Sequence, residues 1–264
     1  SDAANALAAR VALFQNKMTD AANYAEAVLA NSSFSLASTA MDFSKNWVAG
    51  SSSPEIIFAY VNNSRASSPL NFTLYVNDTD GSWNYAPSDW CYNSLFADDN
   101  TLSRKGDVRL KATFTSQDAN RVIKYPNGTY QLAETSDYTC TPVVISRISE
   151  MYLIKAEALG KTNGAAALVE YMKKRYTTAP SEAAIKALSD KEYQTLILDE
   201  RRREFYAEGM RWQDIKRTNR LELLETLDGR TYLMYYPIPQ DEIDMAGTVA
   251  YPQNPGYAGY TGNL

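Results

Sequence analysis

Hydrophobic residues recur at helical spacing in the first part of the chain. The positions are Leu7, Val11, Phe14 and Met18, followed by Ala21, Ala25, Val28 and Leu29. This spacing predicts two helices, each with its own apolar stripe. Thr19 or Asp20 can cap the second helix, and the alanines permit close helix packing. We therefore expect a helical hairpin over about residues 3–30, of the kind that tetratricopeptide repeats stack side by side.

A second helical hairpin is predicted over residues 147–175. Its first helix is apolar around most of its circumference, which predicts burial on several sides. The apolar residues are Ile148, Met151, Tyr152, Ile154, Ala156 and Leu159. Gly160 ends this helix, and Asn163 can cap the next one. The tripeptide at 160–162 is not a phosphate-binding loop, because Lys155 stands where that loop requires glycine.

A third helical region is predicted over about residues 190–219. Ser189 and Glu192 form a capping-box pattern, and Gly209 has the properties of a C-terminal cap. One face of the helix changes from apolar to acidic, through Tyr193, Ile197, Glu200, Glu204 and Glu208. Carboxylates four residues apart repel one another unless cations pair with them. The candidate cations are Arg201, Arg202, Arg203, Arg211 and Arg217.

These carboxylates allow four interpretations, one of which is contact with a binding partner. Glu200 and Glu204 could be the acid and base of a glycosidase, or they could bind a metal together with Asp214. Arginine-paired carboxylates hold protons weakly and serve poorly as general acids. We therefore expect a structural ion-pair network that fixes how helices meet.

Residues 31–141 have no long helical period. Short alternating segments such as EIIFAYV (55–61) and NFTLYV (71–76) predict strands, and turn-rich sequence separates them. A long loop-rich insertion on a helical scaffold is commonly functional.

Composition excludes several classes of function. The net charge of −5 offers no broad basic surface, so nucleic acid is not an expected partner. Without histidine the chain has neither the usual general base nor the usual zinc ligand. Cys91 and Cys140 could bridge each other, although sequence leaves their separation open. No apolar run approaches the ~20 residues of a membrane span.

The segment DGSWNYAPSDWCYN (80–93) is unusually rich in aromatic rings for a polar stretch. Trp83, Tyr85 and Trp90 have few apolar neighbours in sequence that could bury them. Such rings either fill a seam in the protein or stack on a ligand. Trp47, by contrast, precedes a predicted strand and is the kind of tryptophan that is usually in the core.

Four blocks of the sequence resemble the SusD/RagB family of surface glycan-binding lipoproteins. They are AANALAARVAL (3–13), ISRISEMYLIKAEAL (145–159), ERRREFYAEGMRWQDIKR (200–217), and YPIPQDEI (236–243) with QNPGY (253–257). The segment MAGTVAYP (245–252) departs from the family pattern, because it separates YPIPQDEI from QNPGY. The resemblance implies a mainly α fold, in which tetratricopeptide-like hairpins form an α-α superhelix with a long irregular insertion. It implies one domain over 1–264 that lacks the family's N-terminal portion.

The resemblance also implies a function and partners. Family members are not enzymes. They bind oligosaccharide or polysaccharide at the bacterial outer membrane, anchored by a lipid that this chain lacks, and cooperate with a SusC-like TonB-dependent transporter. No cofactor or metal is implied. Asp98, Asp99 and Asn100 only partly match a calcium loop.

The family's motifs form the fold, so no binding residue transfers by motif. The variable segment between the blocks at 53–61 and 95–110 contains the aromatic run. We therefore expect Trp83, Tyr85 and Trp90 to stack on sugar rings. Asp80 and Asn84, together with Asp89 and Asn93, are expected to bond hydroxyls. The alternative function is a helical-repeat scaffold that binds protein and no sugar.

Overall fold

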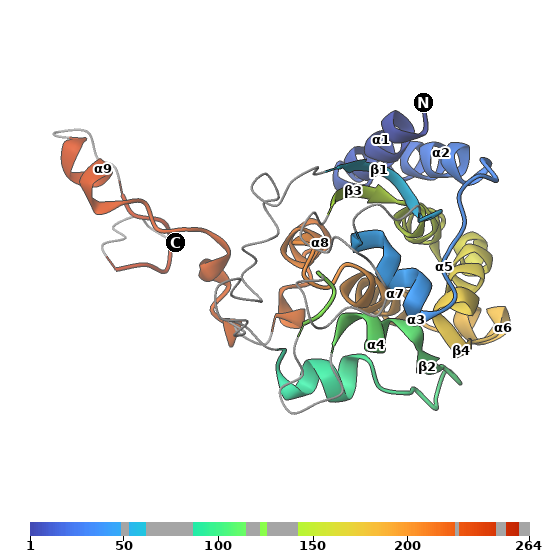
Figure 1. Cartoon of the computed structure of the whole chain (residues 1–264). Coiled ribbons are helices and arrows are strands. Elements are labelled where there is room, and N and C mark those ends of the chain that lie inside the picture. The colour runs from blue at the N-terminus through green and yellow to red at the C-terminus, as the bar shows by residue number, and fades with distance from the viewer. Residues whose placement is uncertain are drawn as a thin grey trace, which may run out of the picture. The chain divides into compact units, whose positions relative to one another are not determined.

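The computed structural model describes residues 1–48, 53–61, 87–114, 122–125, 142–224, 227–246 and 252–258. These residues are mainly helical, which confirms the predicted fold class (Figure 1). The helices are α1 (Asp2–Phe14), α2 (Met18–Leu29), α3 (Ala40–Ser44), α4 (Val108–Thr113), α5 (Ile148–Arg175), α6 (Glu182–Lys186), α7 (Asp190–Glu204), α8 (Met210–Thr218) and α9 (Gln240–Met245). The strands are β1 (Ile56–Tyr60), β2 (Lys105–Asp107), β3 (Val143–Arg147) and β4 (Tyr176–Thr178). The chain divides into two compact units, Ser1–Arg211 and Trp212–Leu264.

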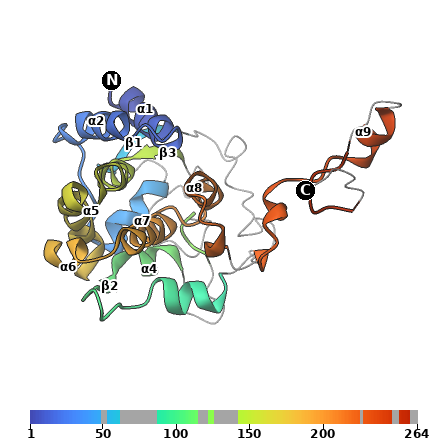
Figure 2. The ribbon, with the colours of Figure 1, turned by 180° about the vertical axis from the view of Figure 1, so that it is seen from behind.

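Helices α1 and α2 form the predicted hairpin and pack against α5 (Figures 1 and 2). The face of α1 that points inward is not the one we predicted. Its buried residues are Ala6, Ala9, Ala12 and Leu13, whereas Leu7, Val11 and Phe14 are 54%, 45% and 36% exposed. Small side chains let helix axes approach closely, so the alanine face packs and the bulkier stripe faces outward. The predicted caps of α2 are also wrong, because Lys17 is the N-cap residue.

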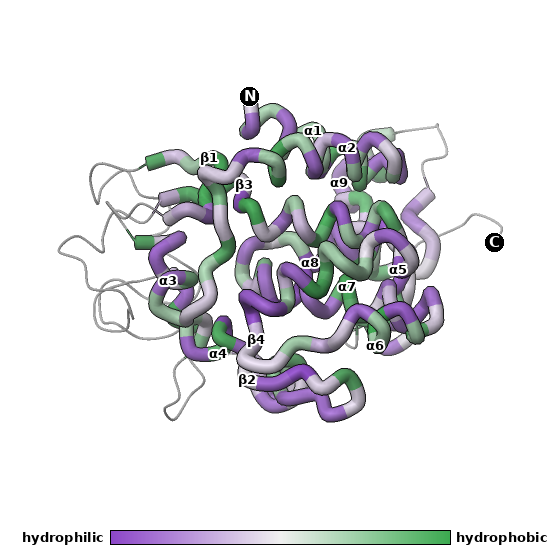
Figure 3. The backbone as a smooth tube through the Cα atoms, turned by 90° about the vertical axis from the view of Figure 1, so that its right-hand side faces the viewer, coloured by the Kyte–Doolittle hydropathy of each residue, from purple (hydrophilic) through white to green (hydrophobic). Residues whose placement is uncertain are grey.

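Helix α5 consists of two helical segments joined at Gly160, whose φ of 64° and ψ of 174° are not helical. This conformation is open essentially only to glycine. A Cβ at Gly164 would lie 2.2 Å from the Ala156 carbonyl oxygen, so the two segments touch there. The second segment begins directly after Gly160, which places Asn163 inside its first turn and not at its cap. Figure 3 shows both hydrophobic and hydrophilic residues along α5.

Helix α7 begins with the predicted capping box, in which Ser189 and Glu192 bond each other's backbone N–H groups. It ends five residues earlier than predicted, at Glu204 instead of Gly209. Gly209 has a φ of +76° and lies in the turn before α8. The acidic stripe therefore continues beyond the helix, and Glu208 belongs to this turn.

Two small antiparallel sheets join the loop-rich insertion to the helical hairpins. Strand β1, which the sequence predicted, pairs with β3 so that Ile56 faces Arg147. Strand β2 pairs with β4, with Lys105 opposite Thr178. The second predicted strand, at 71–76, lies outside the described residues.

Within the unit Trp212–Leu264, hydrogen bonds connect the two family-like sequence blocks YPIPQDEI (236–243) and QNPGY (253–257). The side chain of Gln253, only 6% exposed, accepts a bond from Ile238 N at 2.7 Å and donates one to Ile238 O at 2.8 Å. The Tyr257 hydroxyl donates to the Tyr235 carbonyl oxygen at 2.6 Å. These bonds bring the two blocks together despite the segment that separates them in the sequence.

The Gly160 conformation generates a prediction. Gly160→Ala should lower the free energy of unfolding by about 1–3 kcal/mol, because a side chain is strained at this φ and ψ even though the space around it is open. Urea denaturation followed by circular dichroism measures the change. A Gly160→Ala protein as stable as the wild type would contradict the helix break.

Candidate functional site

The acidic stripe of α7 ends in a buried network of ion pairs. The carboxylates are Glu55, Glu200 and Glu204, and the cations are Arg109, Arg147 and Arg175; each is at most 1% exposed. They come from β1, α4, β3, α5 and α7 or from residues adjoining these elements. The network therefore connects the insertion to the helical hairpins.

Glu204 accepts more hydrogen bonds than either of the other two carboxylates. Its Oε1 accepts from Arg147 Nη1 at 2.5 Å and Arg175 Nη2 at 2.9 Å. Its Oε2 accepts from Arg175 Nε at 2.9 Å, Arg109 Nη1 at 3.2 Å and the Tyr171 hydroxyl at 2.8 Å. One carboxylate is thus shared by three guanidinium groups from separate parts of the chain.

Glu200 and Glu55 each share an arginine with Glu204. Glu200 accepts from Arg109 Nη2 and Arg203 Nη1, each at 2.9 Å, and from the Tyr176 hydroxyl at 2.6 Å. Glu55 accepts from Arg175 Nη2 at 2.7 Å. The pairs are close and supported by neutral hydroxyls, which is what buried charges require.

The network holds its carboxylates in the ionised form. Burial alone would raise the pKa of Glu204, but Arg175 and Arg147 reverse this and hold it well below the ordinary value. Burial also acts to raise the pKa of Glu200, and Arg109 and Arg203 outweigh it. A carboxylate that holds its proton so weakly is a poor general acid. The geometry supports the structural interpretation of this stripe and gives no support to a glycosidase pair.

Most cations in the network were not predicted. Of the five candidate arginines, Arg203 pairs with Glu200, whereas Arg217 pairs with Asp214. Glu208 pairs with Arg147 at 2.7 Å and with Lys124 at 2.5 Å. Burial lowers the pKa of Lys124 to about 8. Arg109, Lys124, Arg147 and Arg175 lie far from α7 in sequence, and no local pattern pointed to them.

Trp90 is the one residue among the predicted sugar-contacting rings that the structure describes. Asp80, Trp83, Asn84 and Tyr85 lie outside the described residues. Trp90 is 45% exposed, and the Arg202 guanidinium lies 4.5 Å from its ring centroid. Asp89 and Asn93, on the same turn-rich segment, are also exposed. The indole is therefore accessible next to polar groups.

The helix that carries Trp90 is firmly attached on its other side. It continues into a π-helix, Cys91–Leu95, a form often found at functional sites. Cys91, Leu95 and Phe96 pack with Phe114 and Val122 in a buried cluster. Arg203 Nε donates to the Leu95 carbonyl oxygen at 2.5 Å, so the ion network reaches this helix directly. The ring is held on a fixed support.

Trp47 is buried, as its sequence context indicated. It is 1% exposed, with Arg147 5.2 Å and Lys124 4.5 Å from its ring. In the calcium-like stretch, Asp99 instead caps a turn, with Oδ1 accepting from Thr101 N at 2.9 Å. Within the described parts of the chain, no cluster of three acidic or cysteine side chains is arranged to hold a metal ion. Cys91 is buried, and Cys140 lies outside the described residues.

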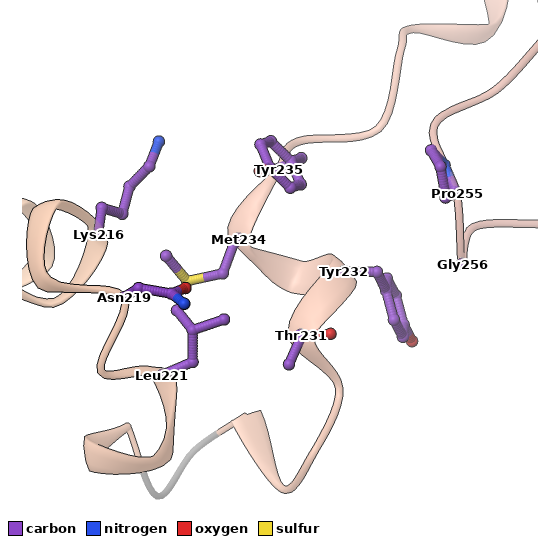
Figure 4. Close-up of a pocket in the computed structure, with 9 residues that line it drawn as sticks. All are labelled: Lys216, Asn219, Leu221, Thr231, Tyr232, Met234, Tyr235, Pro255 and Gly256. Carbon is purple, nitrogen blue, oxygen red and sulfur yellow. The ribbon is translucent and has the colours of Figure 1, made fainter. Parts of the chain in front are cut away.

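A hollow of about 500 Å³ lies within the unit Trp212–Leu264. Figure 4 shows Tyr235 and Pro255 on opposite sides of it, with Tyr232 and Thr231 between them and Lys216 at one end. Lys216 Nζ lies 5.8 Å from the Tyr235 ring centroid. A Cβ on Gly256 would lie 2.4 Å from the Tyr232 ring, so a glycine is required there. Neither Tyr235 nor Lys216 was singled out from the sequence.

The sequence profile of the SusD family matches residues 96–231. The chain belongs to the SusD family. The match contains the part of the ion network from Arg109 to Glu204, whereas Glu55 lies outside the match. The predicted resemblance is thus confirmed.

Among curated relatives, a SusD-like protein of Formosa agariphila is 30% identical over 142 residues, which cover 49% of this chain and 27% of the relative. A SusD superfamily protein of Bacteroides fragilis shares its fold, with a TM-score of 0.65 and 20% identity over 97% of this chain and 64% of that one. A structure described as a laminarin-binding SusD-like protein has a TM-score of 0.58 and 21% identity, over 97% and 62%. Surface glycan-binding protein A of Bacteroides thetaiotaomicron gives a TM-score of 0.56 and 21% identity, over 94% and 62%. This SusD-family chain spans less than two thirds of each of these proteins.

The network generates a prediction of stability. Glu204→Gln should lower the free energy of unfolding by about 3–5 kcal/mol, because it leaves three buried guanidinium groups short of a carboxylate. Glu182→Gln is the control, since Glu182 forms an exposed pair with Lys186 and should change stability by less than about 0.5 kcal/mol. Chemical denaturation compares both with the wild type. Equal stabilities for the two variants would contradict the network's role.

The network also predicts acid sensitivity. The pKa values of Glu204 and Glu200 are lowered from the ordinary value of 4.5 in the folded protein. As the pH falls below 4.5, these two carboxylates therefore become protonated in the unfolded chain while they stay ionised in the folded one. The stability these groups contribute is complete above that pH and is lost as pH falls toward their folded pKa. Urea unfolding at pH 7, 5, 4 and 3 should therefore show a falling free energy. If it is constant from pH 5 to pH 3, the carboxylates are not held as described.

Proposed function

We propose that this SusD-family chain is a non-catalytic carbohydrate-binding protein whose ligand lies against Trp90. The observation that carries the proposal is an accessible indole, 45% exposed, on a helix whose other face is buried. A fixed aromatic plane binds the apolar face of a sugar ring without losing much side-chain entropy on binding. Relatives with the same fold are described as binding laminarin and glycan, which supports this choice of ligand class.

The remaining predicted residues complete the proposed site. Trp83 and Tyr85 would extend the aromatic surface along a sugar chain, and Asp80 and Asn84 would select among hydroxyl patterns. Asp89 and Asn93 are exposed beside Trp90 and supply the same kind of hydrogen bond. The Arg202 guanidinium covers part of the Trp90 ring and limits how the ligand approaches.

We further propose that the protein works in a nutrient-uptake system at the outer membrane of a bacterium. A lipid anchor on the complete protein would hold it at the cell surface, and a SusC-like TonB-dependent transporter would receive the bound glycan. In the described parts of the chain, no helix has the length and apolar character needed to span a bilayer. A binding protein in this role concentrates ligand and carries out no reaction.

One observation favours the second candidate function, a protein-binding scaffold. Leu7, Val11 and Phe14 form an exposed apolar stripe along α1. Exposed apolar surface of this kind often binds another protein. Leu7→Ser with Val11→Ser would abolish binding of such a partner and leave polysaccharide binding unchanged, so the two functions can be separated.

Affinity electrophoresis through gels that contain laminarin, starch, xylan, mannan or pectin tests the proposal. At least one polysaccharide should retard the wild type, and Trp90→Ala should weaken binding by about fivefold to tenfold, as expected for one lost aromatic contact. Trp212→Ala is the matched control, because Trp212 is a similarly exposed tryptophan at 37%. Retardation by no polysaccharide, or an equal effect of the two variants, would refute the proposed site.

A further inference from the structure

A groove of about 860 Å³ runs along one side of α7 within the unit Ser1–Arg211. It is lined by Asp199 and Arg203 of α7, by the 99–104 loop, and by residues of α6 and the turn that leads into α7. The lining alternates charged and hydroxyl groups with leucine and alanine side chains. Such a mixture suits a ligand that is itself both polar and apolar.

Hydrogen bonds within the protein hold both sides of the groove in place. In the 99–104 loop, the Asp99 and Arg104 backbones bond each other at 2.7 and 2.8 Å, and Asp99 Oδ1 also accepts from Leu102 N at 3.3 Å. On the opposite wall, the capping box fixes the start of α7, and Lys161 Nζ donates to the Leu188 carbonyl oxygen at 2.7 Å. A preformed groove spares a ligand the entropic cost of ordering its site.

Two polar side chains at the groove are placed to bond a ligand. The Arg104 side chain is 4% exposed and donates from Nη2 to Ala97 O at 3.1 Å, but its buried Nε has no acceptor among the described residues. A buried donor without an acceptor is costly, and such groups are usually satisfied by water or ligand. The Asp199 carboxylate lines the groove, and the charges of Arg203, Arg211 and Arg202 act on it. An arginine donor and a carboxylate acceptor match the hydroxyls of a sugar, which both accept and donate.

One face of α7 carries both residues that line the groove and the arginine that contacts Trp90. Thr195, Asp199 and Arg202 are spaced i, i+4 and i+7, which places them on one face of the helix. Thr195 and Asp199 line the groove, and the Arg202 guanidinium stacks on Trp90. At ~1.5 Å per residue, the helix rises only about 10 Å between Thr195 and Arg202.

We infer that this groove is a second carbohydrate subsite, into which a sugar chain lying on Trp90 extends, with Asp199 and Arg104 bonding its hydroxyls. The inference rests on the proposed function and specifies its ligand class: chains of several sugars, bound more tightly than a disaccharide. The Trp90 surface alone holds one end of such a chain. The groove adds affinity only when the chain is long enough to enter it.

Titration calorimetry with disaccharides and hexasaccharides from laminarin, amylose, xylan and mannan tests the inference. The wild type should bind the hexasaccharide of its preferred series more tightly than the disaccharide. Asp199→Ala should weaken hexasaccharide binding by about fivefold or more and leave disaccharide binding unchanged. Ala187→Phe should have the same effect, because Ala187 is exposed at the groove and a larger side chain would fill it. Ala183→Phe is the control, since Ala183 lies on α6, is exposed and does not line the groove.

The outcomes distinguish the two proposals. If Trp90→Ala weakens both ligands while Asp199→Ala and Ala187→Phe weaken neither, the groove is not a subsite and the proposed function stands. If the wild type binds none of the oligosaccharides, the proposed function fails and the groove inference fails with it. Loss confined to the hexasaccharide in both groove variants, with Ala183→Phe unaffected, supports the subsite.

Discussion

The structure depends on one buried carboxylate that three arginines share. Glu204 is fully buried and bonds Arg109, Arg147 and Arg175, which come from α4, β3 and α5. Each charge is costly away from water, so the arrangement is stable only when every element is in place at once. Through Arg203, which bonds both Glu200 and the Leu95 carbonyl oxygen, the same network positions the helix that carries Trp90. The ion pairs thus define the surface on which we place the ligand.

Sequence predicted the features that depend on neighbouring residues. The capping box of α7, the helix break at Gly160 and the strand at 56–60 each follow from a few adjacent positions. Sequence failed where a distant partner decides the outcome. Leu7, Val11 and Phe14 had the better hydrophobic pattern, but α2 and α5 pack against the alanine face of α1. Glu200 pairs with the nearby Arg203 as expected, but it also pairs with Arg109, which lies 91 positions away and which no local pattern indicated.

The same distinction applies to the candidate site. Trp90 could be selected from sequence because a polar surrounding segment rarely buries a large ring. The sequence could not identify the neighbouring Arg202 or the groove along α7, because both depend on where α7 lies relative to residues 90–104. The Nε of Arg104, which has no acceptor among the described residues, could not be identified from the sequence either, because the burial of that atom depends on packing. Hydrophobic patterns locate elements, whereas recognition surfaces arise where elements from distant parts of the sequence meet.

The chain contains four tryptophans, which makes indole N–H resonances a direct measure of where a ligand binds. A nitrogen-15 correlation spectrum recorded during titration with the best-binding hexasaccharide would follow all of them together. Trp90 and Trp83 should shift with a common saturation curve, while the buried Trp47 stays in place. If the Trp90 resonance is unchanged at saturation while the ligand is demonstrably bound, the sugar lies elsewhere and the account of an exposed aromatic support is wrong.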